Sequence, residues 1–358
     1  MMEARVAKRI APRLDSAGFS LDVEFQVCSG ITALFGPTAA GKTLTLDVIA
    51  GFARPDAGRI LLDDRILFDA ASRVNLPPRL RNCGYVLRND ALFPHMTVRQ
   101  NLIFAAQQQP GLERHRRVNE MIERFRLTDI AARRPQEISR GQKQSCAIAR
   151  ALSSSPRVVL LDEPTRGLDA TWRSEVYRLL HEIRADFQIP VLLVSQDIEE
   201  CCQLGDEMLI LREGRILQSG RPRQILEQPA SVDVARLLGI SNLFQAEITA
   251  LDPGRNTSRV RFGGQELTGP YFPGHLRGDR VWLCVRAEDL RVVPHNGARP
   301  EANQLAASLL RVSEKSRSVR LEFSGDISVE LPRQEFEQLK DNKEWLVEFP
   351  AGALRVVS

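Results

Sequence analysis

Gly36-Pro37-Thr38-Ala39-Ala40-Gly41-Lys42-Thr43 is the segment from which the architecture of this 358-residue chain can be worked out. The apolar residues 31–35 before it predict a buried strand, and residues 43–50 after it predict a helix. This order is typical of a glycine-rich loop whose backbone N–H groups surround phosphates at the start of a helix. We therefore expect all eight residues to bind a nucleotide, with Lys42 on the β- and γ-phosphates and the Thr43 hydroxyl on Mg²⁺.

A second predicted strand ends in two carboxylates. Residues 158–161 are Val-Val-Leu-Leu, and Asp162 and Glu163 follow them. A continuous apolar run predicts a parallel strand that is buried on both faces and meets its ligand at the carboxyl end. Asp162 would then hold Mg²⁺, directly or through water, and Glu163 would polarise the attacking water. A solvated acidic turn is the alternative interpretation.

Other polar residues stand at the ends of predicted elements. Ser139-Arg140-Gly141-Gln142, which we call the signature segment, opens a helix, and Asp169 precedes a long amphipathic helix. The strand predicted at 83–87 leads into Arg88, and the strand at 191–195 leads into Gln196. Strands that alternate with helices, with polar residues at the strand ends, predict an α/β fold with a mainly parallel sheet.

Two strands are predicted before the phosphate loop, at residues 4–10 and 19–27, and both would lie beside the nucleotide. Phe19 or Phe25 could stack on an adenine ring, although packing of both rings in the core is the favoured alternative. Further on, Thr97 is expected to cap a helix that runs to residue 106. Residues 113–126 predict a surface helix with one apolar stripe.

Composition limits the class of protein. Hydrophobic residues make up 43% of the chain and charged residues 26%, and the net charge of +4 is too mild to indicate nucleic-acid binding. The six cysteines lack the spacing of a zinc or redox site, so we expect them to be reduced and buried in a cytosolic protein. No run approaches the ~18 apolar residues of a membrane helix. A role at a membrane would therefore require a partner that spans the bilayer.

The order of these motifs resembles the ATP-binding subunit of an ATP-binding-cassette (ABC) transporter, over residues 1 to about 240. Residues 58–64 and 92–101 are similar to importers of the molybdate, sulfate and polyamine type. The resemblance implies a P-loop cassette with a helical subdomain, which uses ATP and Mg²⁺ to drive uptake of a small solute such as a molybdate-like oxyanion. It also implies transmembrane permease subunits as partners, an indirect link to a substrate-binding protein, and a location on the inner face of the cell membrane.

The same resemblance implies a head-to-tail pair of chains that encloses two ATP molecules. Each nucleotide would lie between one chain's phosphate loop and the other chain's signature segment. Ser139, Gly141, Gln142 and Asp169 are therefore expected to contact the nucleotide. The positive end of the helix that starts at Ser139 would face the γ-phosphate, so that ATP joins the chains and ADP does not.

Four residues depart from the family pattern. Arg88 replaces a glutamine that touches Mg²⁺ and water, and it would weaken metal binding or contact phosphate instead. Arg140 replaces a glycine where the partner's nucleotide approaches closely. Ser145 replaces an arginine. Gln196 replaces the switch histidine and offers a neutral hydrogen bond without a titratable proton.

These departures leave the activity open at the level of sequence. Nucleotide binding by Lys42 and Thr43 would be little affected, whereas turnover through Glu163, Arg88 and Gln196 is in doubt. An active transport ATPase and a hydrolytically weak nucleotide sensor are both compatible with the residues. A non-transport ABC ATPase is less favoured, because the sequence has neither a coiled-coil or zinc insertion nor a second cassette.

After residue 239 the sequence changes to short strands with glycine turns, so we expect domains at 1–239 and 240–358. A weak repeat of roughly 63 residues divides the second domain into 240–295 and 303–358. Each half carries a hairpin, at Gly263-Gly264 and at Gly325-Asp326. We therefore predict two small barrels. Such tandem barrels resemble the regulatory domain appended to the importers named above, and this resemblance implies a fold similar to oligonucleotide/oligosaccharide-binding (OB) barrels. Sensing of an oxyanion and a role as a dimerisation or spacer module are both compatible with this arrangement.

Overall fold

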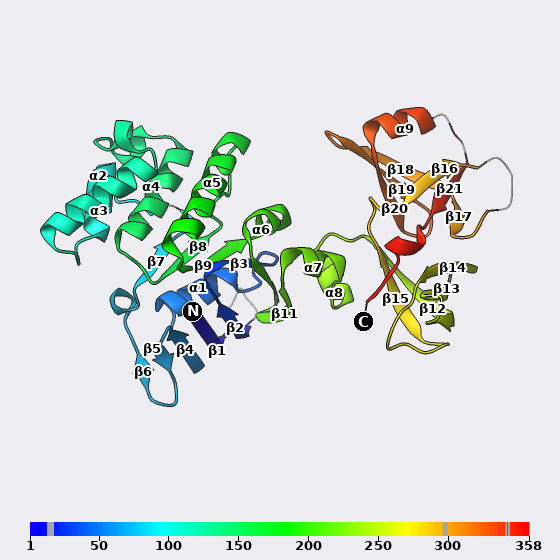
Figure 1. Ribbon diagram of the computed structural model, residues 1–358, viewed down its shortest axis with the longest axis horizontal. Helices are drawn as coiled ribbons and strands as arrows, with labels where there is room; N and C mark the ends of the chain where they lie inside the picture. Colours follow the sequence, from blue (N-terminus) through cyan, green and yellow to red (C-terminus); the bar gives the residue numbers. More distant parts are fainter. Residues whose placement is uncertain (13–17, 90, 296–299, 341, 343, 358) are drawn as a thin grey trace. The chain divides into compact units, whose positions relative to one another are not determined.

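The computed structural model describes residues 1–12, 18–89, 91–295, 300–340, 342 and 344–357. The chain divides into two compact units, Met1–Ile225 and Leu226–Ser358 (Figure 1). The division lies before the boundary expected at residue 240. A physical reason is that the apolar side of α8 (Val232–Leu237) belongs to the second unit, where Ala235 packs with Cys284 and Val357.

A six-stranded sheet forms the centre of the first unit and confirms the predicted α/β fold. Its order is β11-β10-β3-β9-β8-β7, and every neighbouring pair except β10 with β11 is parallel. Alternate residues of β8 pack on opposite faces, with Val159 and Leu161 in one core and Val158 and Leu160 in the other. The six strands are β3 (Gly30–Phe35), β7 (Cys83–Val86), β8 (Val158–Asp162), β9 (Pro190–Ser195), β10 (Glu207–Arg212) and β11 (Arg215–Gly220).

An antiparallel sheet of order β2-β1-β4-β5-β6 covers one of these cores. Met2, Ala4 and Val6 lie two residues apart on β1 and point into the core that also holds α1 (Lys42–Ala50). The period of two explains why the sequence alternates between apolar and polar residues here. The strands are β1 (Met2–Ile10), β2 (Phe19–Val27), β4 (Ala57–Leu62), β5 (Arg65–Asp69) and β6 (Val74–Asn75), followed by a 3₁₀ turn at Pro78–Leu80.

Helices cover the other core, and α2, α3 and α4 gather into a helical subdomain (Figure 1). Thr97 caps α2 with a capping box, as the sequence predicts. Val118, Met121 and Ile122 form the buried stripe of α3. Within the described ranges, no helix combines the length and the apolar character needed to cross a membrane. The helices are α2 (Val98–Ala105), α3 (Gly111–Arg124), α4 (Arg140–Ser153), α5 (Ala170–Phe187) and α6 (Ile198–Leu204), with 3₁₀ turns at Thr128–Ile130 and Pro135–Glu137.

Arg81 is a buried cation that no sequence pattern predicts. Only 1% of its surface is exposed, and its guanidinium donates to the carbonyl oxygens of Val48 and Ile49, each at 2.8 Å. Those carbonyls end α1, where a positive charge complements the helix dipole. Burial lowers the pKa of Arg81. The helix that begins at the phosphate loop is therefore fixed at its far end by a charged side chain.

The cysteines differ from the prediction that all six are buried. Cys28 is exposed, and Cys83 and Cys202 are partly exposed, so the prediction is wrong for these three. All six are free thiols. Burial raises the pKa of Cys83 to about 12 and that of Cys284 to about 11, which disfavours their reactive thiolate forms.

The second unit is all-β apart from short helices, in agreement with the predicted class, but its two halves exchange strands. β15 of the first half pairs with β22, and β16 pairs with β21 of the second half. A single apolar core takes side chains from both halves, so neither half is a self-contained barrel. The three sheets have the orders β14-β13-β12-β15-β22, β16-β21-β17 and β18-β19-β20.

Both predicted hairpins are present, between β13 and β14 and between β19 and β20. The strands are β12 (Asn242–Asp252), β13 (Thr257–Phe262), β14 (Gln265–Pro270), β15 (Arg280–Val285), β16 (Arg291–Pro294), β17 (Gln304–Ala307), β18 (Leu309–Glu314), β19 (Ser318–Phe323), β20 (Ile327–Pro332), β21 (Trp345–Glu348) and β22 (Arg355–Val357). The remaining helices are α7 (Pro222–Glu227), α9 (Arg333–Leu339) and a 3₁₀ turn at Ala351–Ala353.

Candidate functional site

The predicted phosphate loop connects the end of β3 to the start of α1. A Cβ at Gly36 would lie 2.1 Å from the carbonyl oxygen of Leu211, so this position accepts no side chain. Gly41 has a φ of 105°, a left-handed conformation that favours glycine. The Lys42 ammonium donates to the carbonyl oxygens of Gly36 and Pro37, each at 2.7 Å, and holds the loop curled. Burial lowers the pKa of Lys42, while the nearby carboxylates Glu163 and Asp162 act in the opposite direction.

Thr43 and Asp162 meet at the carboxyl ends of β3 and β8. The Thr43 hydroxyl donates to Asp162 Oδ2 at 2.9 Å, and Asp162 is 3% exposed. The other carboxylate oxygen, Oδ1, is buried and has no hydrogen-bond partner within the described ranges. Burial raises the pKa of Asp162. A buried oxygen without a partner beside a hydroxyl suits a hard cation such as Mg²⁺, which takes one or two protein oxygens and completes its shell with phosphate and water.

Glu163 occupies the turn directly after β8 and is held by two arginines. Its φ of 48° is unusual for a residue with a side chain, and its amide donates to the Val194 carbonyl at 3.0 Å. Glu163 Oε2 lies 3.2 Å from Arg88 Nε and 2.9 Å from Arg166 Nη1. Only 8% of the glutamate side chain is exposed. The carboxylate predicted to polarise water is therefore ion-paired with cations from two different segments.

Gln196 bridges the phosphate loop and Glu163. Its amide nitrogen donates to Glu163 Oε1, and its amide oxygen accepts a hydrogen bond of 3.1 Å from the Thr38 hydroxyl. Both carboxylate oxygens of Glu163 thus have partners, in contrast to those of Asp162. The structure brings together Lys42, Thr43, Asp162, Glu163, Arg88 and Gln196 as predicted.

Comparisons with known proteins show the family to which the chain belongs. The pattern of the ABC transporter family matches residues 21–166. The molybdenum import ATP-binding protein ModC of Rhodospirillum rubrum is 35% identical over 303 residues, which is 82% of this chain and 80% of that protein. The chain belongs to the family of ABC importer ATP-binding subunits.

Further comparisons support this family and its fold. The spermidine/putrescine import ATP-binding protein PotA of Vibrio cholerae is 38% identical over 262 residues, or 72% of this chain and 67% of that protein. The solved structure of cbiO1 from Clostridium perfringens, part of an ABC transporter complex, is 27% identical. It superimposes with a TM-score of 0.54 over 66% of this chain and 92% of cbiO1.

The signature segment of this ABC subunit begins α4. Ser139 is the N-cap, and its hydroxyl accepts from the Gln142 amide at 3.2 Å while the Gln142 side chain accepts from the Ser139 amide at 2.9 Å. The Trp172 ring lies against Gly141, where a Cβ would be 2.0 Å from Trp172 Cδ2. Asp169 caps α5 by accepting from the Trp172 amide at 2.9 Å. Ser139 and Gln142 therefore contact each other directly, and Trp172 connects Gly141 to Asp169.

Arg140 does not project freely from the signature segment of the ABC subunit. Its Nη2 donates to the Arg166 carbonyl oxygen at 3.0 Å, and its guanidinium covers Gly167. Arg88, which is expected to weaken metal binding or to contact phosphate, forms an ion pair with Glu163.

The two aromatic candidates for adenine stacking lie in different environments. Phe25 is 7% exposed and belongs to the core between the sheets. The Phe19 ring is partly buried, and its Cζ would lie 2.9 Å from a Cβ placed at Gly41. Phe19 is thus the candidate that lies beside the phosphate loop.

Two residues of the site were missed by reasoning from sequence. Arg166 is one of the two arginines that form ion pairs with Glu163. Trp172, in the first turn of α5, packs its ring against Gly141 of the signature segment. A signal for Arg166 exists, since a cation three residues after Glu163 can fold back across a turn. The signal for Trp172 is weaker, because nothing in its spacing distinguishes it from an ordinary core aromatic residue.

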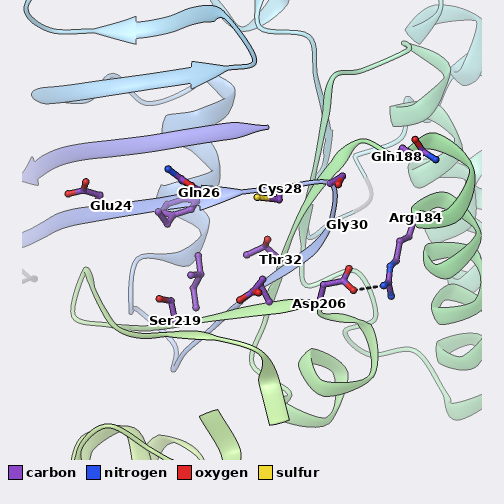
Figure 2. Close-up of a pocket in the computed structure, with 13 residues that line it drawn as sticks. Glu24, Gln26, Cys28, Gly30, Thr32, Arg184, Gln188, Asp206 and Ser219 are labelled. Carbon is purple, nitrogen blue, oxygen red and sulfur yellow. Dashed lines mark ion pairs between the residues drawn. The ribbon is translucent and has the colours of Figure 1, made fainter. Parts of the chain in front are cut away.

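A separate pocket of about 780 Å³ lies at the opposite, amino-terminal end of β3 (Figure 2). It is lined by Gly30, Cys28 and the ion pair between Arg184 and Asp206, among others. None of the predicted nucleotide-binding residues lines it. The predicted nucleotide-binding residues Lys42, Thr43 and Asp162 lie instead at the carboxyl end of β3 and β8.

Proposed function

We propose that this chain binds and hydrolyses ATP to drive the import of a small solute. The observation that carries the proposal is the meeting of Thr43 with Asp162, whose Oδ1 is buried without a partner, beside a phosphate loop closed by Lys42. Lys42 would exchange its two backbone carbonyls for the β- and γ-phosphates, since an anionic acceptor gives a stronger hydrogen bond. The loop amides and the start of α1 would add further donors.

Thr43 and Asp162 are the residues that would hold Mg²⁺, which shields phosphate charge when bound. Glu163 would polarise the attacking water and accept its proton. For that it must be free of Arg88 or Arg166, because a carboxylate that two cations stabilise is a weaker base. Gln196 would keep its hydrogen bond to Glu163 or donate to the γ-phosphate, and it carries no proton of its own to transfer.

The assembly that we propose is a head-to-tail pair of chains with two ATP molecules between them, docked on transmembrane permease subunits at the inner face of the cell membrane. A substrate-binding protein would deliver the solute to the permease. We propose a molybdate-like oxyanion as cargo, in keeping with the name of the molybdenum import protein from Rhodospirillum rubrum. The relative from Vibrio cholerae is named for polyamines, which makes a polyamine the natural competitor in a test.

Uptake by cells that carry the chain and its permease tests the transport proposal. Labelled molybdate, sulfate and spermidine would be supplied separately, with a Lys42→Ala variant as the matched control. We expect uptake of molybdate that the variant loses. Uptake of spermidine alone would move the cargo to the polyamine class, and equal uptake by the variant would contradict a role for ATP.

A hydrolytically weak subunit is a second candidate, because Arg88, Arg166 and Gln196 occupy both oxygens of Glu163. Phosphate release by the purified chain with Mg-ATP separates the two candidates. A rate equal to that of a Glu163→Gln variant, with ATP still bound, would favour the weak subunit or sensor. Substitution of Arg88→Gln, Arg140→Gly and Gln196→His together should then raise turnover, and no gain would show that these residues are not the cause.

A further inference from the structure

A line of contacts leads from the signature segment to the carboxylate that polarises water. Arg140 Nη2 donates to the Arg166 carbonyl oxygen at 3.0 Å, and Arg166 Nη1 lies 2.9 Å from Glu163 Oε2. Arg140 also covers the next residue, because a Cβ at Gly167 would be 2.6 Å from its Nη1. The side chain of Arg140 therefore rests on the peptide whose own side chain restrains Glu163.

The turn between the two ends of this contact line has an unusual backbone. The Arg166 amide donates to the Glu163 carbonyl at 3.2 Å, Glu163 has a φ of 48°, and Gly167 has a φ of 69°. Residues with side chains rarely adopt such a conformation, and it persists where the surroundings hold it in place. Arg140 is part of those surroundings, so its displacement would loosen the turn.

Arg140 is placed to meet an anion. It is exposed and occupies the first turn of α4, a 14-residue helix whose N-terminus carries partial positive charge. Its present acceptor, the Arg166 carbonyl, is neutral. Arginine binds phosphate oxygens through a planar pair of N–H donors, and such charge-assisted bonds are stronger than bonds to a carbonyl. A phosphate brought to the start of α4 would therefore compete successfully for Arg140.

We propose that Arg140 is a positioning residue that holds Arg166 against Glu163 in the single chain, and that the phosphates of a nucleotide on a second copy draw Arg140 away and release the carboxylate. The proposal rests on the head-to-tail pair described under the proposed function. The proposal assigns a role to Arg140, a bulky residue at the position where the partner's nucleotide approaches closely. Occupation of a chain's signature segment by its partner's ATP would remove one of the two arginines from that chain's Glu163 and leave Arg88 as the other.

A double-mutant cycle on the full chain tests this relay. Phosphate release is measured for the wild type, Arg140→Gln, Arg166→Gln and the double variant, across Mg-ATP and protein concentrations. Arg166→Gln is expected to raise kcat about three- to fivefold, the order of a partly exposed ion pair, with KM for ATP changed less than about twofold. In the Arg140→Gln background, the same substitution should leave kcat unchanged, because the relay is already broken.

Arg140→Gln should also weaken pairing of the chains, since it removes a contact with phosphate. We expect the protein concentration for half-maximal turnover to rise about tenfold. Arg133→Gln, an exposed arginine before the same helix, serves as the control and should change neither quantity. An Arg166→Gln effect of equal size in both backgrounds would overturn the relay, and so would unchanged pairing in Arg140→Gln.

Failure of the relay can be told apart from failure of the proposed function. Binding of a fluorescent ATP analogue and ATP-dependent pairing by light scattering are measured in the Glu163→Gln background, which removes turnover. If ATP is bound and the chains pair, independent effects of Arg140 and Arg166 refute the relay alone. If the Glu163→Gln chain with Arg140 and Arg166 intact neither binds ATP nor pairs, the proposed function fails and the relay fails with it.

Discussion

The two carboxylates at the end of β8 are neighbours in sequence but differ in how their oxygens are used. Asp162 accepts one hydrogen bond from Thr43 and keeps its second oxygen buried without a partner in the described structure. Glu163 has both oxygens occupied, by two arginines and a glutamine. The half of the site that we propose binds nucleotide therefore has an oxygen free for its ligands, and the half proposed to activate water is restrained. We expect that binding and turnover can be altered separately in this chain.

The largest expected effect is on the binding half. Lys42→Ala should weaken ATP binding by about 100-fold or more, because charge-assisted hydrogen bonds to phosphate contribute roughly 1.5–3 kcal/mol each. Equilibrium titration with ATP measures the affinity, and Lys315→Ala in the second unit serves as the matched control. An affinity within threefold of the wild type would show that the loop binds without its lysine.

Asp162→Asn should separate the metal from the nucleotide. The amide can still accept from Thr43, but it lacks the negative charge that attracts Mg²⁺. We expect the increase in ATP affinity that Mg²⁺ produces to be about tenfold smaller in Asp162→Asn than in the wild type. ATP affinity in a chelating buffer should be the same for both chains. Titrations with and without Mg²⁺ measure both values. A loss of affinity in the chelating buffer as well would indicate a structural defect in place of a metal effect.

On the restrained half, Arg88→Gln should raise kcat about fivefold, since it removes one of two partly exposed charges from Glu163. KM for ATP should change little. Steady-state phosphate release at saturating Mg-ATP measures the effect, with Arg133→Gln as the control. A fall in kcat would mean that Arg88 contributes to the reaction itself, and the contrast between the two carboxylates would need to be redrawn.

The smallest expected effect concerns Glu200, a third buried carboxyl group. It accepts hydrogen bonds from the hydroxyls of Thr165 and Ser195. Burial raises its pKa above the ordinary value of 4.5, so the folded chain holds this proton more tightly than the unfolded chain. Its contribution therefore favours folding at low pH and is lost as pH rises from about 4.5 toward the raised value. Glu200→Gln should remove that loss and stabilise the fold by about 1 kcal/mol at pH 8.

Urea unfolding at pH 5 and pH 8 checks this prediction. The difference between Glu200→Gln and the wild type should be larger at pH 8, and phosphate release should be unchanged within twofold. Equal differences at the two pH values would show that the carboxyl is not protonated preferentially in the folded chain.

The sequence predicts the binding half well because local backbone geometry determines it. The order of strand, glycine-rich loop and helix fixes where Lys42 and Thr43 lie, and the apolar run of β8 places Asp162 beside them. The parallel sheet follows from the same alternation of strands and helices. Each of these inferences depends on residues close in sequence or on strand ends that share one edge.

The restrained half was harder to predict because it depends on which long side chains meet in three dimensions. Arg88 and Arg166 have many accessible rotamers, and both form ion pairs with Glu163 because that carboxylate is charged and buried. The same holds for Arg81, whose partners are backbone carbonyls that no sequence pattern marks. In the second unit, the repeat predicts strands but not their pairing, since nothing in the sequence of β22 marks β15 as its partner.

The exchange of β16 and β22 affects how the second unit forms during synthesis. When β15 leaves the ribosome, β22, which pairs with it, is still untranslated. The free edge of β15 therefore stays exposed until the second half has been made. Exposed strand edges readily pair with other chains. We infer that the first half gains its final hydrogen bonds only after the second half has been made, and that cutting the chain between the repeats would yield two fragments that associate or aggregate.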